Sequence, residues 1–309
     1  MQGKKIEQFR IRTWKSWLRA VLLFGLAFGT FSCGRVAPLG ESAAVHARES
    51  VYDRVIRTGT IRASFAVYPP YCIKDPNTGK LSGVMVEMLG EAAARLKLKL
   101  EWTEEVGWGT IFEGLNSDRY DIFGAGVWRN SSRGKVGDFS QPLFFNVIKV
   151  YGRADETRFT GAFDEINRRD VRLSVMDGAI DDIIGSQDFP SAQKVSVQQL
   201  NPVTDMLLNI TSHKADVTFA EPGFINQYLA KNPGTLKELC GGKPIRVFAN
   251  TYAFKLGEPA FKAMLDSCLD EMLNDGTVER ILRRYEKNQG EYLRVALPYR
   301  LPTGAGNAN

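Results

Sequence analysis

The chain has 309 residues, of which 44% are apolar and 11% aromatic, enough to build packed cores and to exclude extended disorder. Residues 1–33 hold six basic side chains and one acidic one, and the rest of the chain holds 34 of each. The net charge of +5 therefore belongs to the N-terminal segment, and the remainder lacks the basic footprint of a nucleic-acid-binding protein.

The basic N-terminal segment runs into an apolar stretch over residues 20–29, a length typical of an export signal and short for a membrane span. Cys33 follows a small residue, as in bacterial lipoprotein signals that are cleaved before a lipidated cysteine. We therefore predict a signal peptide over residues 1–33, lipidation of Cys33, a tether over residues 34–50 and a location in the periplasm or at the outer face of a bacterial membrane. Cleavage after Ala47 with plain secretion, or an uncleaved anchor, are the alternatives.

From Val51 onward short apolar runs alternate with amphipathic stretches, and a second such series begins near Asp170. In the first series we predict strands at 61–67, 98–102 and 120–127, and helices at 86–96 and 108–115. In the second we predict strands at 171–176, 194–197, 217–220 and 245–254, helices at 181–186, 203–212 and 223–230, and two helical segments in 258–285 broken around 274–276. Helices between short strands indicate parallel βαβ units, so the two series predict two α/β lobes with a ligand cleft between them.

The remaining cysteines and the histidines show no pattern that implies chemistry. Cys72, Cys240 and Cys268 have no metal-ligand spacing, and Cys240 and Cys268 could either form a disulfide or be two buried thiols. The two histidines, His46 and His213, also lack such a spacing, and no nucleophile elbow, phosphate loop or zinc-protease motif occurs. We therefore predict no catalytic residue, no metal and no cofactor.

Several short landmarks follow one another in a fixed order over residues 54–287. They are Arg57–Arg62, Tyr68–Tyr71, Gly79–Gly83, Trp108, Asp118–Ile122, Arg133 with Asp138–Pro142, Lys214–Val217 with Glu221–Pro222, and Asp275–Thr277 with Ile281 and Tyr285. In this order they resemble the extracellular solute-binding proteins of family 3, which deliver polar amino acids to ABC transporters. The resemblance implies an α/β, periplasmic-binding-protein-like type II fold, with lobe 1 at 51–149 and 249–287, lobe 2 at 150–248, a hinge of two strands near 147–153 and 247–253, and a C-terminal tail at 288–309.

The resemblance also implies a ligand-binding site. The family holds the ligand α-carboxylate with an arginine that begins a helix, which corresponds to Arg133; a guanidinium fork suits a carboxylate, and residues 130–132 are good capping residues. The acid for the α-ammonium corresponds to Glu221, whose alternative role is to stabilise a helix N-terminus. Tyr68 and Tyr71 match the aromatic residue that packs over the ligand, although Tyr71 could equally be part of the core.

Departures from the family pattern bear on the ligand. Trp128 stands where the family has Thr or Ser, so it keeps an amide and loses a hydroxyl, and it could form a pocket wall or pack between lobes. Where the family has a glycine followed by a pair of Thr or Ser residues, this chain has Gly178, Ala179 and Ile180. These three residues offer backbone donors and no side-chain hydroxyl. Gly126, in the strand that leads to Trp128, is the last member of the predicted site.

The same departures make the distal part of the pocket more apolar than in family members that bind glutamate, glutamine or histidine. Ala66 also offers no acid where binders of cationic amino acids usually have one. We therefore predict a monomer that binds a neutral, apolar or aromatic amino acid, or a related small carboxylate, and delivers it to an ABC-transporter permease. Hinge closure over the ligand is the predicted mechanism. The alternatives are an enzyme on the same fold, such as a cyclohexadienyl dehydratase, and a sensor without a transport role.

Overall fold

The computed structural model describes residues 48–288 and 290–295. The predicted signal peptide, the Cys33 lipidation site, most of the tether and most of the C-terminal tail lie outside these residues. Within the described segments, no helix combines the length and the apolar character needed to cross a lipid bilayer.

Parallel strands form the two ends of one long sheet. We call the first lobe the part built on β1 (Thr60–Phe65), β4 (Lys99–Glu105) and β5 (Ile122–Trp128), which run parallel in the order β4-β1-β5. The second lobe is built on β8 (Arg172–Met176), β9 (Gln193–Val197) and β10 (Val217–Ala220), parallel in the order β10-β8-β9. The predicted parallel βαβ units are therefore confirmed.

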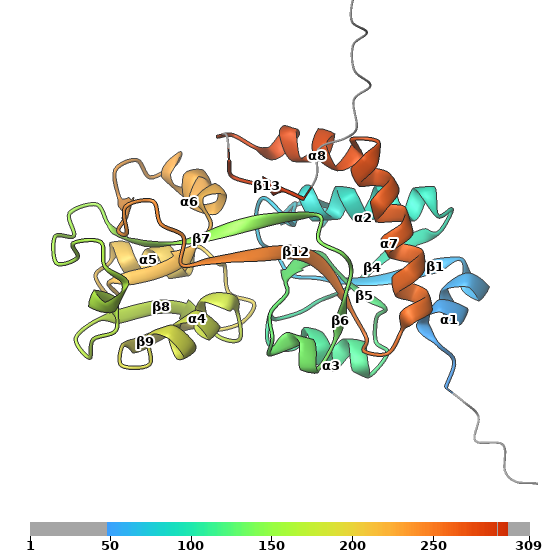
Figure 1. Cartoon of the computed structure of the whole chain (residues 1–309), viewed down its shortest axis with the longest axis horizontal. Coiled ribbons are helices and arrows are strands. Elements are labelled where there is room, and N and C mark those ends of the chain that lie inside the picture. Colours follow the sequence, from blue (N-terminus) through green and yellow to red (C-terminus); the bar gives the residue numbers. More distant parts are fainter. Residues whose placement is uncertain (1–47, 289, 296–309) are drawn as a thin grey trace, which may run out of the picture. The chain divides into compact units, whose positions relative to one another are not determined.

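Two long antiparallel strands join the lobes (Figure 1). β7 (Phe144–Arg153) pairs with β12 (Arg246–Phe254) over residues 144–148 and then with β10 and β11 (Leu236–Glu238) in the second lobe. β12 continues from Asn250 into the first lobe, where it pairs with β5 and with β6 (Asp138–Phe139). Each strand thus belongs to both lobes, as the predicted hinge requires.

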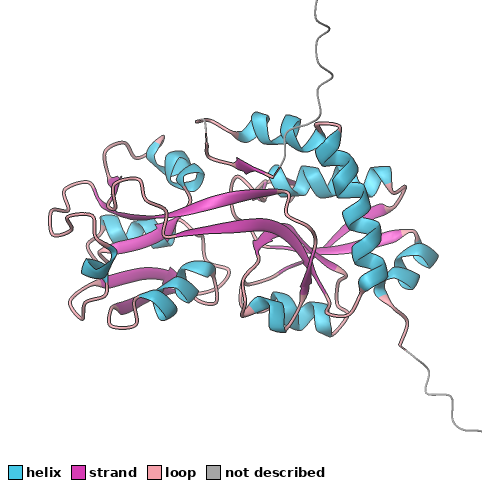
Figure 2. Ribbon diagram, in the orientation of Figure 1, coloured by secondary structure: helices cyan, strands magenta, loops and turns pink. Residues whose placement is uncertain are grey.

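Helices cover the sheet in both lobes (Figure 2). Those of the first lobe are α1 (Val51–Thr58), α2 (Val84–Arg95), α3 (Ile111–Asn116), α7 (Pro259–Asn274) and α8 (Thr277–Tyr285), and those of the second are α4 (Ile180–Asp188), α5 (Asp205–Thr211) and α6 (Pro222–Leu229). The predicted break between α7 and α8 falls at Gly276, whose φ of 79° suits glycine. The sequence pattern missed α1, because this helix is short and buries only Val51 and Val55.

The remaining described elements are short. They are β2 (Ile73–Lys74), β3 (Leu81–Ser82), β13 (Leu293–Arg294) and the 3₁₀ turns η1 (Arg133–Lys135) and η2 (Phe163–Ile166). Cys72, Cys240 and Cys268 are buried free thiols, so the alternative of a Cys240–Cys268 disulfide is wrong. The predicted fold class, two α/β lobes joined by two strands, is confirmed, while the lobe limits taken from the family resemblance stay a prediction.

Candidate ligand-binding site

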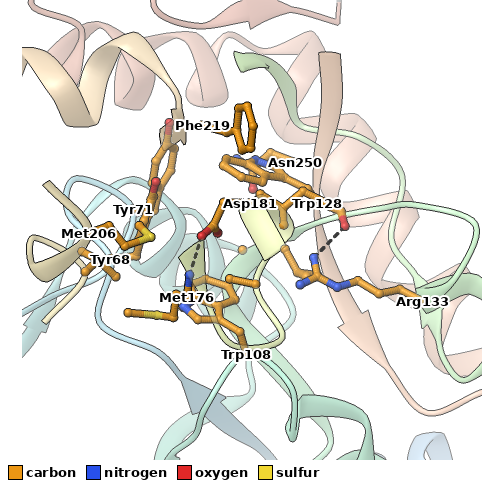
Figure 3. Close-up of a pocket in the computed structure, with 16 residues that line it drawn as sticks. Tyr68, Tyr71, Trp108, Trp128, Arg133, Met176, Asp181, Met206, Phe219 and Asn250 are labelled. Carbon is orange, nitrogen blue, oxygen red and sulfur yellow. Dashed lines mark hydrogen bonds between the residues drawn. The ribbon is translucent and has the colours of Figure 1, made fainter. Parts of the chain in front are cut away.

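A cavity lies where the two lobes meet (Figure 3). It contains about 550 Å³ of space free of protein atoms, part of it open to solvent. The first lobe and the crossing strand β12 contribute Tyr68, Tyr71, Trp108, Ala125, Gly126, Val127, Trp128, Arg133 and Asn250. The second lobe contributes Met176, Ala179, Ile180, Asp181, Val203, Met206 and Phe219. Most of this lining is aromatic or aliphatic, and Arg133 and Asp181 bring opposite charges to it.

Arg133 lies in the loop that follows β5, and its side chain is 6% exposed. Its Nη1 donates a hydrogen bond of 3.0 Å to the Trp128 carbonyl, whereas Nη2 is buried and has no hydrogen-bond partner among the described residues. Burial lowers the pKa of Arg133 to about 10, so the guanidinium stays charged at neutral pH. A buried cation with a free donor is suited to a carboxylate from outside the chain.

The resemblance predicts that Arg133 begins a helix, and the structure corrects the kind and length of that helix. Arg133 begins the three-residue 3₁₀ turn η1, and the Asn130 side chain, not that of Ser132, accepts the hydrogen bond from its amide. So short a turn has little macrodipole, and the side chain of Arg133 must therefore supply most of the attraction for an anion.

Tyr68 and Tyr71 follow β1 and stand together on one wall of the cavity. Their rings stack with centroids 5.7 Å apart, and Tyr68 also stacks on Phe224 of the second lobe at 5.3 Å. The Tyr71 hydroxyl accepts a hydrogen bond from Asn146, and its ring is 3% exposed and packs on Phe144. Tyr71 therefore belongs to the core and lines the cavity as well.

Trp128 and two asparagines connect the cavity to the crossing strands. The Trp128 ring stacks on Phe248 of β12, and its Nε1 donates a hydrogen bond of 3.4 Å to the Asn146 side chain. Asn146 Oδ1 also accepts a bond of 2.7 Å from Asn250, so the two asparagines bridge β7 and β12 inside the protein. Sequence reasoning missed both asparagines, because 104 residues separate them.

Gly126 has a structural reason to be glycine. Its φ is +83°, and a Cβ atom would lie 2.6 Å from Met85 Cγ and 2.7 Å from Asn250 Oδ1. The backbone of β5 therefore passes close to both groups, where a side chain would be strained and crowded.

Glu221 lies at the end of β10, as predicted, but it does not line the cavity. The side chain is fully buried; Oε2 accepts a hydrogen bond of 2.8 Å from the Tyr68 hydroxyl, and Oε1 has no partner among the described residues. Burial raises the pKa of Glu221 to about 7. In this conformation Glu221 contacts the first lobe through Tyr68.

The turn from Gly178 to Ile180 also differs from expectation. Ala179 and Ile180 line the cavity, whereas Gly178 packs against the first lobe, where its Cβ would lie 2.8 Å from Gly109 Cα. The Gly178 amide donates to Asp182 and the Ala179 amide donates to Met176, so the turn itself uses two of the backbone donors expected for a ligand.

Asp181 is the charged residue of the cavity that sequence reasoning missed. It is 4% exposed, lines the cavity from the start of α4, and accepts a hydrogen bond from the Met176 amide. Burial raises the pKa of Asp181 to about 7. The available signal was an acid directly after a strand and a glycine turn, which we took only as the beginning of a helix.

A two-lobed α/β fold with a cavity between the lobes is characteristic of solute-binding proteins. The chain belongs to the bacterial extracellular solute-binding proteins, family 3, whose family model matches residues 61–288. In the described residues, no group of three or more His, Cys, Asp or Glu side chains could hold a metal ion.

Named relatives are distant. A probable amino-acid ABC transporter-binding protein of Haemophilus influenzae is 23% identical over 263 residues, covering 85% of this chain and 93% of the relative. The L-cystine-binding protein TcyA of Bacillus subtilis is 24% identical over 71% of this chain and 77% of its own length. A cyclohexadienyl dehydratase of Pseudomonas aeruginosa is 24% identical, with 86% and 92% covered.

Solved structures share the fold. The ancestral amino acid-binding protein AncCDT-1, a precursor of cyclohexadienyl dehydratase, matches with a TM-score of 0.68 at 22% identity, over 77% of this chain and all of that one. A cysteine-binding protein from Campylobacter jejuni matches with a TM-score of 0.69 at 16% identity, over 79% and 99%. At these identities the likeness establishes the fold alone.

Proposed function

We propose that this protein binds an amino acid with a neutral, apolar or aromatic side chain, or a related small carboxylate, outside the cytoplasm and delivers it to an ABC transporter. The observation that carries the proposal is the guanidinium of Arg133, buried beside the cavity with Nη2 lacking a partner among the described residues. A ligand carboxylate would satisfy that donor in surroundings where an unpaired charge is costly.

The walls of the cavity support the proposed side-chain class. Tyr68, Trp108 and Trp128 of the first lobe line it together with Met176, Met206 and Phe219 of the second. Such a lining favours an apolar or aromatic ligand side chain, because burial of apolar surface contributes about 25 cal/mol per Å². Methionine side chains also adapt their shape to what they contact.

Hinge closure is the proposed mechanism. The ligand would dock on the first lobe through Arg133, and the second lobe would then bring the turn at Ala179 and Ile180 over it. The crossing strands β7 and β12 would bend, since they are paired with each other while β7 is also paired with β10 of the second lobe and β12 with β5 of the first.

A thermal-shift screen of the twenty amino acids and a set of small carboxylates tests the proposal. A ligand at about 100 times its Kd adds about 2.7 kcal/mol to stability, which raises the Tm by roughly 5–10 °C. Arg133→Ala should weaken binding of the hit at least about tenfold, because a charge-assisted hydrogen bond is lost. Arg129→Ala is the matched control, since Arg129 is exposed and close in sequence. A hit that Arg133→Ala binds as tightly as the wild type would contradict the assignment.

A dehydratase activity is the second candidate. It is favoured by the relative from Pseudomonas aeruginosa and by Asp181, a buried cavity acid whose pKa of about 7 suits proton transfer at neutral pH. Incubation with prephenate and analysis of the products separates the two functions, because a binding protein returns its ligand unchanged.

A further inference from the structure

Asp181 and Arg133 reach the same cavity from different lobes. Asp181 projects from the start of α4 in the second lobe, whereas Arg133 projects from the loop after β5 in the first (Figure 3). The guanidinium forms its hydrogen bond with the Trp128 carbonyl, and no ion pair within 4.0 Å joins it to Asp181 in the described part of the chain. Two opposite charges therefore border the cavity without neutralising each other directly.

The carboxylate of Asp181 is held in place and retains capacity for a ligand. Its Oδ2 accepts a hydrogen bond from the Met176 amide at the end of β8, which fixes the side chain beside the cavity. That bond leaves Oδ1 without a hydrogen bond to the other described residues. A buried carboxylate is costly unless a cation or several donors satisfy it.

Glu221 is less suited to contact a ligand in this conformation. Its Oε2 accepts the hydrogen bond of the Tyr68 hydroxyl, and its Oε1 has no partner among the described residues, but unlike Asp181 the residue does not contribute to the cavity lining. Tyr68, which does line the cavity, connects Glu221 to it. Glu221 therefore fixes the position of the Tyr68 ring and joins the two lobes through it.

We infer that Asp181, rather than Glu221, receives the ammonium group of an α-amino acid whose carboxylate is bound by Arg133. The inference rests on the proposed function and narrows it, because a zwitterion satisfies both charges of the cavity at once. The protein then selects α-amino acids over the 2-hydroxy acids that share their side chains and carboxylate.

A comparison of paired ligands tests this inference. Titration calorimetry would measure the Kd of L-leucine, L-methionine and L-phenylalanine, each against its 2-hydroxy acid, for the full chain and its variants. The wild type should bind the tightest of the amino acids at least about tenfold more strongly than its 2-hydroxy acid. Asp181→Asn should reduce that ratio to about two or less, while Asn Oδ1 can still accept the Met176 hydrogen bond.

Two further variants separate a role in binding from a role in folding. Asp188→Asn is the matched control, because Asp188 is the last residue of α4 and its carboxylate pairs with Arg246 outside the cavity lining. This control should keep the full ratio, as should Glu221→Gln. A ratio that survives in Asp181→Asn and disappears in Glu221→Gln would overturn the inference.

The ligand pairs also distinguish the two proposals from each other. If the wild type binds 2-hydroxy acids as tightly as amino acids, the role of Asp181 is refuted while carboxylate binding at Arg133 stands. If neither the amino acids nor the small carboxylates of the screen bind, the proposed function fails and the inference fails with it.

Discussion

Asp181 and Glu221 are both fully or almost fully buried in the second lobe, and each lies at the beginning of a helix after a strand. Burial raises the pKa of both carboxyl groups from their usual values near 4 to about 7, and their mutual repulsion contributes to the shift of Glu221. Both side chains therefore change protonation in the range where the protein would meet its ligand.

These shifts predict how stability depends on pH. A carboxyl group with a raised pKa in the folded state holds its proton there more tightly than in the unfolded chain, so its contribution to stability falls as pH rises from about 4.5 to about 7. We expect the Tm of the ligand-free protein to fall by at least about 2 °C between pH 5.5 and 8. The measurement is calorimetry in buffers of constant ionic strength.

The doubly substituted protein Asp181→Asn, Glu221→Gln is the control for this dependence. Neither amide titrates, so its Tm should change less over the same interval. Asp216 and Glu156, whose pKa values are lowered, lose their stabilising charge at more acidic pH and do not account for a fall above pH 5.5. An identical slope in both proteins would contradict the assignment to Asp181 and Glu221.

At the scale of an element, β5 is the strand in which backbone conformation and the site depend on each other most closely. Its seven residues end at Trp128, and its neighbours in the sheet are β1 on one side and β12 on the other. The positive φ at Gly126 lets the strand pass Met85 and Asn250 and present the cavity residues beyond it.

Gly126→Ala should therefore destabilise the protein by about 2–4 kcal/mol, from the strained φ and the crowding of Met85 and Asn250 together. The free energy of unfolding in urea measures the effect. Gly134→Ala is the matched control, because Gly134 is a nearby glycine whose Cβ would meet nothing within 4 Å. Equal stability of the two variants would show that β5 tolerates a side chain at this point.

The regular elements were largely predictable from local pattern, and the contacts across the cavity were not. Strand β10 was predicted at its observed limits, Val217 to Ala220, because a short buried strand between polar turns is visible in the sequence. The polar bridge of Asn146 and Asn250 was invisible, since only the crossing of β7 and β12 brings the two side chains together.

The residues of the candidate site also fall into those that the sequence predicted and those that it did not. Family resemblance led to Arg133, Tyr68 and Trp128, which lie on the cavity. It also led to Glu221, which lies outside the lining and is hydrogen-bonded to the cavity residue Tyr68. Asp181 was missed because the cavity that it lines is formed by residues of both lobes, which no short sequence window contains.

At the scale of the whole molecule, the two lobes touch at Gly109, the residue after Trp108 of the cavity lining. Gln199 of the second lobe accepts a hydrogen bond of 3.0 Å from the Gly109 amide of the first, and Gly178 packs backbone to backbone against Gly109. These contacts, with the bond from Tyr68 to Glu221, favour the closed arrangement of the lobes.

Gln199→Ala removes the side-chain contact and should shift the lobes toward opening. We expect ligand affinity to fall about 2- to 10-fold through faster dissociation, the effect of one neutral hydrogen bond. Small-angle scattering should give a larger radius of gyration for the ligand-free variant than for the wild type. Gln198→Ala, at the exposed neighbouring position, should change neither quantity. Unchanged dissociation in Gln199→Ala would remove this contact from the closing mechanism.

The position of Trp128 gives the protein an optical reporter of its own. The indole lies on the cavity, stacks on Phe248 and is tied through Asn146 to the strands that would bend. Ligand entry and closure should both alter its surroundings, and with them the wavelength and intensity of its emission. Trp108 also lines the cavity and would respond to the ligand as well, whereas Trp102 packs edge-on against Phe65 away from the cavity lining and would supply a steady background. Stopped-flow fluorescence could then resolve docking from closure in real time, without a dye attached to the molecule.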